Sequence, residues 1–380
     1  MVGRVRIGID VRALDTASGR RGVGSYIRGL ICGLAHALRG GQDEVLLFRH
    51  RWAGKDPGLP GAFTAVSLTR PRRAITLWDQ IAWPPLLARR RVGVFHSPFY
   101  AVPRFRPAAC RVVQTIHDLT PLKLPGTVSK RNARLFAANF NLARGADRII
   151  VPSKATKADV VALLKIPEDR IAVVPQGCDI TPVDLTRADE EVGRVMEGLR
   201  LKERYLLHTG GHDVVKNLPR LLDAFASLVG QGRDLSLVIA GEHGPDTSAV
   251  IGRAAMLGLL ERVSLPGYVS RQDLVALYRG AAALVYPSYT EGFGLPVLEA
   301  MACGTPVVAA RAGALPEVGG DACLYADPAD AGSIAAAVVR ILDEPETAAA
   351  LSRGGRARAA RFTWSETARK TLAVYREAAA

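Results

Sequence analysis

The alternation of apolar and polar positions along the chain predicts short strands separated by amphipathic helices. In the second half, short apolar runs are typical of buried strands, and a longer segment with apolar residues at helical spacing is typical of a helix. The predicted strands are YLLHTGG (205–211), LSLVIAG (235–241), RVSLPGY (262–268), ALVYPS (283–288), PVVAA (306–310) and ACLYAD (322–327), with a helix at NLPRLLDAFASLV (217–229). Such an order indicates a parallel sheet that is covered by helices on both faces.

The first half repeats this pattern. Its predicted strands are VRIGID (5–10), EVLLFR (44–49), VGVFHSP (92–98), RVVQTIHD (111–118) and RIIVPS (148–153), with a helix from about Gly24 to Leu38. A segment rich in proline and glycine, VVPQGCDITPVDL (173–185), separates the halves. We therefore expect two α/β domains with a ligand cleft between the carboxyl ends of their sheets.

Charge and composition narrow the functional classes. The net charge of +14 is uneven, since residues 1–185 carry 29 Lys/Arg against 13 Asp/Glu, and residues 186–380 carry 21 against 23. A basic half of this kind fits nucleic acid, an anionic membrane or a phosphorylated substrate as a partner, or simply a solubilising surface. Five cysteines without a CxxC pair and a start without a signal-peptide core favour the cytoplasm.

The segment YPSYTEGFGLPVLEAMACGTPVVAA (286–310) places Glu291 and Glu299 around a glycine loop at the start of a helix. Gly292 and Gly294 allow close backbone approach to a ligand, and a helix N-terminus presents free N–H groups to an anion. Because carboxylates repel a bare phosphate, we expect the glutamates to bind hydroxyls while the backbone binds phosphate. A sugar nucleotide carries both groups.

Taken alone, this segment also fits an ordinary connection between a strand and a helix. Its Glu-x7-Glu spacing with Gly-Phe-Gly and proline, however, closely resembles the donor-site motif of glycosyltransferase family 4, retaining enzymes of the GT-B fold. The resemblance implies that Glu291 contacts the donor sugar and Glu299 the nucleotide ribose. It also implies that the backbone amides of Phe293, Gly294 and Leu295 bind the diphosphate and the sugar.

A second segment, GGHDVVKNLPRLLDAF (210–225), resembles the family's other donor motif. The resemblance implies that Lys216 binds the diphosphate, although by itself this lysine also fits a solvated residue at a helix start. Gly211 occupies the place where many members carry an arginine, so a second phosphate-binding charge is missing there.

Two segments of the first half complete the resemblance. QTIHDLTPL (114–122) is similar to the segment whose histidine lies over the donor sugar, which implies a catalytic role for His117. Asp118 either orients this histidine or caps a helix. RRGVGSYIRGL (20–30) resembles the loop whose glycines, here Gly22 and Gly24, approach the donor phosphates and the acceptor.

The resemblance covers nearly the whole chain and implies an α/β GT-B fold of two Rossmann-like, doubly wound parallel-sheet domains that face each other across a cleft. Residues 1–183 would bind the acceptor, residues 184–365 the nucleotide sugar, and a C-terminal helix, 366–380, would pack back on the first domain. The sequence lacks Asp-x-Asp, HExxH, a Walker loop and zinc-type Cys/His spacing. We therefore expect no metal or other cofactor.

The predicted activity is retaining transfer of a hexose from a nucleoside-diphosphate sugar, with GDP-mannose favoured, to a glycan or lipid-linked acceptor. The predicted setting is polysaccharide or lipopolysaccharide assembly at the cytoplasmic side of the membrane. The alternatives are a nucleotide-sugar epimerase of the same fold, a glycoside hydrolase that uses Glu291 and Glu299, and a basic nucleic-acid-binding protein.

Arginines flank Trp78 and Trp83 in RPRRAITLWDQIAWPPLLARRR (70–91). Arginine together with tryptophan suits a lipid headgroup interface. This stretch therefore predicts peripheral contact with an anionic membrane. A buried amphipathic helix with a solvated rim is the alternative.

Overall fold

The computed structural model describes residues 5–50, 59–68, 75–99, 102–178 and 180–380. The chain divides into two units, an N-terminal unit of Met1–Gly177 with Phe362–Ala380 and a C-terminal unit of Cys178–Arg361. The chain therefore passes from the N-terminal to the C-terminal unit after residue 177 and returns after residue 361, whereas the expected domain ends were 183 and 365. The first passage comes earlier because helix α6 (Pro182–Gly198) packs against α9 (Arg271–Gly280) of the C-terminal unit.

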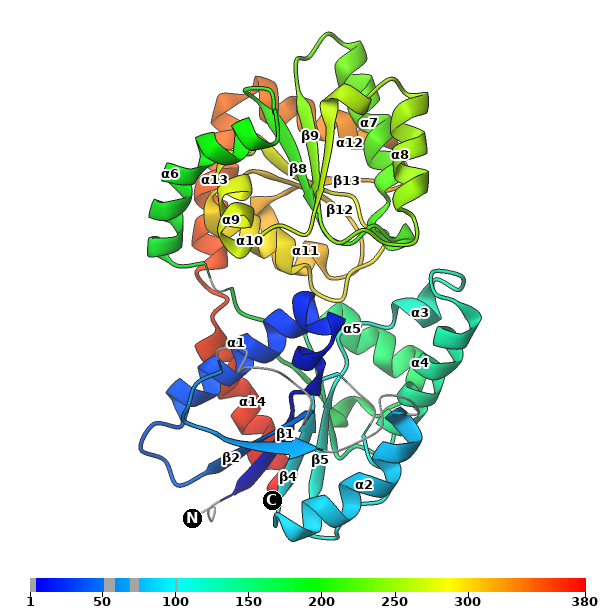
Figure 1. The fold of residues 1–380 in the computed structure, drawn as a ribbon, viewed down its shortest axis with the longest axis vertical. Coiled ribbons are helices and arrows are strands. Elements are labelled where there is room, and N and C mark those ends of the chain that lie inside the picture. The colour runs from blue at the N-terminus through cyan, green and yellow to red at the C-terminus, as the bar shows by residue number, and fades with distance from the viewer. Residues whose placement is uncertain (1–4, 51–58, 69–74, 100–101, 179) are drawn as a thin grey trace. The chain divides into compact units, whose positions relative to one another are not determined.

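The N-terminal unit is built on a parallel sheet of the order β3-β2-β1-β4-β5-β6-β7. Its strands are β1 (Arg6–Asp10), β2 (Glu44–His50), β3 (Thr64–Leu68), β4 (Val94–Ser97), β5 (Arg111–Thr115), β6 (Arg148–Val151) and β7 (Ile171–Val173). Its helices are α1 (Gly22–Ala37), α2 (Ile75–Arg89), α3 (Thr120–Lys123), α4 (Lys130–Ala143), α5 (Lys154–Asp159) and α14 (Trp364–Ala379). Helices cover both faces of this sheet (Figure 1).

Alternating side chains of the same strands form two separate cores, one on each face. Val45 and Leu47 of β2 contribute to the core under α1 and α14, whereas Leu46 and Phe48 contribute to the core under α2. Because both faces are buried, the strands are almost continuously apolar, as parallel sheets usually are.

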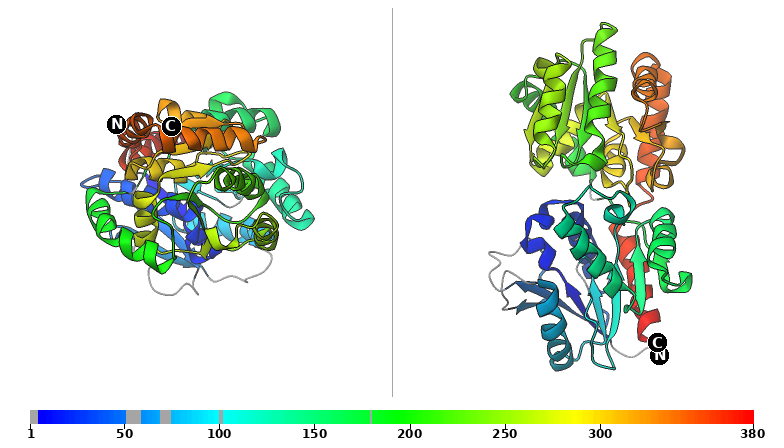
Figure 2. Two further views of the ribbon diagram at one scale, coloured as in Figure 1. Left: turned by 90° about the horizontal axis from the view of Figure 1, so that it is seen from above. Right: turned by 90° about the vertical axis from the view of Figure 1, so that its right-hand side faces the viewer.

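The C-terminal unit repeats this architecture with the strand order β10-β9-β8-β11-β12-β13. Its strands are β8 (Tyr205–Thr209), β9 (Ser236–Ala240), β10 (Val263–Gly267), β11 (Ala283–Tyr286), β12 (Val307–Ala310) and β13 (Leu324–Ala326). Its remaining helices are α7 (Leu218–Gly230), α8 (Thr247–Met256), α10 (Leu295–Cys303), α11 (Leu315–Gly319), α12 (Ala331–Asp343) and α13 (Pro345–Ala359). The layers of this unit are visible in the right-hand view of Figure 2.

In each sheet the strand order reverses direction at one point, between β1 and β4 and between β8 and β11. Doubly wound sheets bind ligands outside the carboxyl ends of their strands at such a switch point. The predicted architecture of two doubly wound parallel sheets is therefore confirmed. Functional residues are expected at the two switch points.

Helix α14 packs along α1 within the N-terminal unit (Figure 1). Gly29 and Gly33 of α1 face Trp364, and a Cβ atom on either glycine would lie closer than 3 Å to Trp364. Tyr375 of α14 also reaches the sheet, where its hydroxyl lies 2.6 Å from Nδ1 of buried His96. The C-terminal helix is thus an integral part of the N-terminal unit's core, and it begins at Trp364.

The membrane prediction for residues 70–91 needs a correction at Trp83. This side chain is only 1% exposed and lies against Phe48 and Phe95, with ring centroids at 5.1 and 4.5 Å. The guanidinium of Arg12 lies 4.8 Å from the centre of its ring. Trp83 is therefore a core residue, whereas Trp78 is 39% exposed, and residues 70–74 lie outside the described part of the chain.

Candidate functional site

The two predicted donor motifs follow the two strands that flank the switch point of the C-terminal sheet. One loop leaves β8 after Thr209 and reaches Lys216, while the other leaves β11 after Tyr286 and reaches Glu291. The backbone N–H of Tyr289 donates to the carbonyl of Val215 at 2.9 Å and joins the two loops. Residues far apart in sequence thus meet at the edge of the sheet where ligands bind.

Lys216 and Glu291 form an ion pair at this edge. The Lys216 ammonium donates to Oε1 of Glu291 at 2.7 Å and to the hydroxyl of Tyr286 at 2.9 Å. The two charged side chains are 17% and 15% exposed. Burial lowers the pKa of Lys216, but the charge of Glu291 and the bonds to Glu291 and Tyr286 outweigh it, so the pKa lies well above its usual value. The site therefore offers a permanent positive charge.

Helix α10 begins at Leu295, four residues after Glu291. Gly294 precedes it with a φ of 105°, in the left-handed region that favours glycine, and Pro296 occupies the first turn. The positive end of the helix dipole lies at this turn, where the N–H of Val297 donates to the carbonyl of Gly294 at 3.1 Å. Phe293 is buried just before the turn. Binding of an anion by the backbone of residues 293–295 stays a prediction.

Glu299 lies one turn into α10 and is held by a tyrosine. The hydroxyl of Tyr278 donates to Oε2 of Glu299 at 3.1 Å and lies 3.0 Å from Oγ1 of Thr209, at the end of β8. Burial, followed by the charge of Glu299, raises the pKa of Tyr278. The two predicted glutamates therefore have different settings, because Glu291 pairs with a cation while Glu299 accepts from a neutral hydroxyl.

Gly211 has no steric need to be glycine. A Cβ atom there would meet its nearest neighbour, Oδ2 of Asp213, at 3.7 Å, which is an ordinary contact. By contrast, a Cβ on Gly241 would lie 1.8 Å from the carbonyl oxygen of Gly210. The backbone segments at these two positions are therefore so close that residue 241 must be glycine. The missing arginine is therefore a chemical difference from the motif and does not follow from crowding.

His117 lies in the N-terminal unit, two residues beyond the end of β5. Its Nε2 lies 2.8 Å from the carbonyl oxygen of Pro98, which only accepts, so this nitrogen carries the proton. Nδ1 then accepts from the amide of Gln176 at 3.3 Å, and the ring meets Tyr26 edge to face at 4.8 Å. Burial lowers the pKa of His117, partly offset by Pro98 and Asp118, so the ring is neutral.

Asp118 and the predicted glycine loop both stabilise the local backbone of the N-terminal unit. Asp118 Oδ1 accepts from the N–H of Thr120 at 2.9 Å, but the N-cap residue of α3 is Leu119, so Asp118 stabilises the turn before α3 and is not the cap of that helix. Gly22 and Gly24 lie in the first turn of α1, which begins two residues earlier than expected. A Cβ on Gly24 would lie 2.1 Å from the carbonyl oxygen of Gly19, so glycine is required by close backbone packing.

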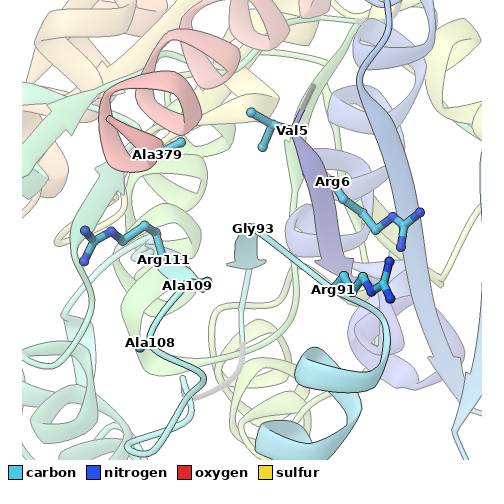
Figure 3. A pocket seen from close by; sticks show the side chains of 8 residues that line it. All are labelled: Val5, Arg6, Arg91, Gly93, Ala108, Ala109, Arg111 and Ala379. Carbon is cyan, nitrogen blue, oxygen red and sulfur yellow. The ribbon is translucent and has the colours of Figure 1, made fainter. Parts of the chain in front are cut away.

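A cavity of about 480 Å³ opens at the other end of the N-terminal sheet, beside the amino ends of β1, β4 and β5. Arg6, Arg91 and Arg111 line it, and Figure 3 shows Arg6 and Arg91 on one side with Arg111 on the opposite side. Arg6 is already paired with Glu44 at 2.7 Å. This cavity lacks a convergent set of donors, and none of the predicted site residues lines it.

Sequence reasoning missed three polar side chains that hold the predicted ones, namely Tyr278, Tyr286 and Gln176. Tyr286 is the first residue of the quoted donor motif, and Gln176 belongs to the segment that separates the halves. All three residues stand next to apolar residues in the sequence, a setting that is typical of strand ends and turns and does not indicate a functional side chain. Their partners come from other strands and loops, so no local spacing could have identified them.

In the described part of the chain, no helix is long and apolar enough to cross a membrane.

Comparison with known proteins gives the same assignment for both halves of the chain. Residues 21–181 match the family model for Glycosyltransferase Family 4, and residues 189–358 match the model for Glycosyl transferases group 1. The chain is 30% identical over 323 residues to the O-antigen chain mannosyltransferase B of Escherichia coli, covering 83% of this chain and 80% of that protein. It is 34% identical to the MMP alpha-(1->4)-mannosyltransferase of Mycolicibacterium hassiacum, covering 63% of this chain and 56% of that protein.

Solved structures agree on the fold. The sucrose-phosphate synthase of Thermosynechococcus elongatus superposes with a TM-score of 0.76 at 24% identity, covering 98% of this chain and 99% of that one. WaaG, a glycosyltransferase involved in lipopolysaccharide biosynthesis, gives a TM-score of 0.72 at 16% identity, covering 97% and 99%. With two doubly wound parallel sheets and these relatives, the chain belongs to glycosyltransferase family 4 and is a hexosyltransferase of the GT-B fold.

Proposed function

We propose that this glycosyltransferase moves mannose, with retention of configuration, from GDP-mannose to a lipid-linked glycan during polysaccharide assembly. The observation that carries the donor class is the Lys216–Glu291 pair at the switch point of the C-terminal sheet, beside the N-terminus of α10. A cation and the positive end of a helix dipole suit a diphosphate, and carboxylates suit sugar hydroxyls. Two relatives at 30% and 34% identity are named as mannosyltransferases, which supports the sugar.

The chemistry proposed for this site is charge stabilisation. Lys216 and the first-turn amides of α10 offset the charge that develops on the departing diphosphate, while Glu291 and Glu299 hold hydroxyls of the sugar and ribose. By analogy with the family, the departing phosphate assists the acceptor hydroxyl on its own face of the sugar. Because a protein cation serves the diphosphate, we propose that no metal is needed, and transfer should persist in excess EDTA. Loss of activity that Mg²⁺ restores would overturn this part.

The donor is tested by ligand-dependent stability. GDP, UDP and dTDP, with their sugars, are compared in a thermal shift assay, since a ligand at 100 times its Kd adds about 2.7 kcal/mol to the free energy of unfolding. We expect GDP and GDP-mannose to give the largest shifts. A larger shift with UDP or dTDP compounds would change the donor, and no shift with any of them would refute a nucleotide-sugar site.

A lipid-linked acceptor is supported by one surface of the N-terminal unit, formed by Trp78 and Ile81 of α2 with Phe105. Ile81 is 62% exposed and Phe105 is 66% exposed. Gln80 fixes the loop of Phe105 to α2, because its amide donates to Val102 at 3.1 Å and accepts from the N–H of Arg104 at 2.6 Å. Residues 80–117 contain six arginines and neither aspartate nor glutamate. Exposed apolar side chains among arginines suit an anionic bilayer surface.

Vesicle flotation tests this surface. Binding should require anionic lipid, weaken with salt, and fall in Ile81→Ala and Phe105→Ala. Met256→Ala is the control, because Met256 is apolar and even more exposed, at 79%, but belongs to the C-terminal unit. Equal binding to neutral vesicles, or equal effects of all three substitutions, would contradict the proposal.

A further inference from the structure

A buried tyrosine lies behind the donor ion pair. Tyr286 ends β11, is 1% exposed, and receives a hydrogen bond from the Lys216 ammonium at 2.9 Å. Burial, followed by the charge of Glu291, raises the pKa of Tyr286, so its hydroxyl stays protonated. One neutral hydroxyl therefore binds the cation of the ion pair on which the proposed donor site depends.

The ring of Tyr286 is itself held in a defined place. It stacks on His208 of β8, with ring centroids at 5.3 Å and an interplanar angle of 14°. Nδ1 of His208 donates to the carbonyl oxygen of Val285 at 3.0 Å, and burial lowers the pKa of His208 to about 3. His208 is therefore neutral at physiological pH and adds no repulsion to the nearby lysine. Strands β8 and β11, which carry His208 and Tyr286, thus hold the Tyr286 ring, and with it the hydroxyl, in one position.

This arrangement removes most of the freedom of a lysine side chain. An ammonium group has three N–H donors on a flexible stem, and a lone lysine offers only a mobile point charge. Here Tyr286 and Glu291 take two of the three donors. Within the described part of the chain, the third has no hydrogen-bond acceptor, so it remains for a ligand.

We propose that Tyr286 is a positioning residue, whose hydroxyl fixes the Lys216 ammonium so that its remaining N–H is held ready for the diphosphate of the donor. The inference rests on the proposed nucleotide-sugar function. The hydroxyl does not touch the substrate, and it acts only through Lys216 and Glu291. A preorganised donor loses less conformational freedom on binding than a mobile one, so the effect appears as affinity and as stabilisation of the leaving diphosphate.

The experiment is Tyr286→Phe, which keeps the ring on His208 and removes only the hydroxyl. Tyr205→Phe is the matched control, because Tyr205 is equally buried in the same sheet and its hydroxyl donates to the carbonyl of Leu277 at 2.7 Å. Calorimetry with GDP and with inorganic pyrophosphate should show about 5- to 20-fold weaker binding for Tyr286→Phe, which is less than the loss of a whole bond to a charged group because Lys216 itself remains. Tyr205→Phe should bind within about twofold of the wild type.

A double-mutant cycle with Lys216→Ala separates positioning from a structural effect. If Tyr286 acts through the lysine, Tyr286→Phe should cause almost no further loss of pyrophosphate affinity once Lys216 is gone. Equal losses in both backgrounds would overturn the proposal, as would wild-type affinity in Tyr286→Phe. If the folded wild type binds neither GDP, UDP, dTDP nor pyrophosphate, the proposed donor class itself fails, and that outcome is distinct from a wild type that binds while Tyr286→Phe has no effect.

Discussion

Gly29→Ala should destabilise the N-terminal unit, although the same change in most helices is stabilising. Alanine has a higher helix propensity than glycine by about 1 kcal/mol. At Gly29, however, a Cβ atom would lie 2.0 Å from Cε2 and 2.2 Å from Cδ2 of Trp364, which is buried under α1. Carbon atoms need about 3.5–4.0 Å, so the indole or the whole of α14 must move by about 1.5–2 Å.

Overpacking of this kind costs about 1–3 kcal/mol and sometimes more. Because a separation of 2.0 Å is a deep overlap, we take the upper end of this range, about 3 kcal/mol, and subtract the gain in propensity of about 1 kcal/mol. We therefore expect a net loss of about 2 kcal/mol in the free energy of unfolding. The four tryptophans, Trp52, Trp78, Trp83 and Trp364, all belong to the N-terminal unit, so tryptophan fluorescence reports its unfolding. With a urea slope of about 2 kcal/mol/M, the midpoint should fall by about 1 M.

Gly193→Ala is the matched control for this measurement. Gly193 lies within α6, and nothing is found within 4 Å of a Cβ placed there. This variant should leave the fluorescence transition unchanged, because α6 belongs to the C-terminal unit, and should slightly raise the stability seen by circular dichroism. An unchanged or higher fluorescence midpoint for Gly29→Ala would refute the packing argument, since it would mean that the indole accommodates a methyl group without strain.

Three further predictions concern the sites. Lys216→Ala should weaken GDP binding by about 1.5–3 kcal/mol, since it removes a charge-assisted bond and leaves Glu291 unpaired; unchanged affinity in calorimetry would remove Lys216 from the site. His117→Ala should reduce kcat by about 10²–10³-fold while GDP affinity is retained, because the donor residues belong to the other unit; near-normal turnover would leave His117 a structural role only. Burial raises the pKa of Asp79 to about 7, despite its bond to Arg12, so the folded state keeps a proton that the unfolded state releases near pH 4. The free energy of unfolding should therefore fall as pH rises from about 4 to 7 and then level off, and urea midpoints of Asp79→Asn should show a smaller dependence.

Much of the fold could be predicted from local patterns. Parallel strands buried on both faces are almost uniformly apolar, so most strands of both sheets stood out. The short edge strands β3 and β7 were missed, because an edge strand has fewer buried positions to mark it. The proline and glycine residues of 173–185 predict a loop between the halves, but they do not specify that the units divide at residue 177.

The candidate donor residues could be named from sequence because their motif is local, with Glu291, Gly294 and Glu299 on one strand–loop–helix connection. The sequence by itself therefore determined which residue types lie at the N-terminus of α10 and in the loop after β8. Only the tertiary structure decided that Lys216 pairs with Glu291, that Tyr286 holds the lysine, and that Trp83 is buried in the core. The physical reason is that these contacts join strands and loops that lie many residues apart, and a hydrogen bond or a buried ring is specified by the partner that folding brings to it.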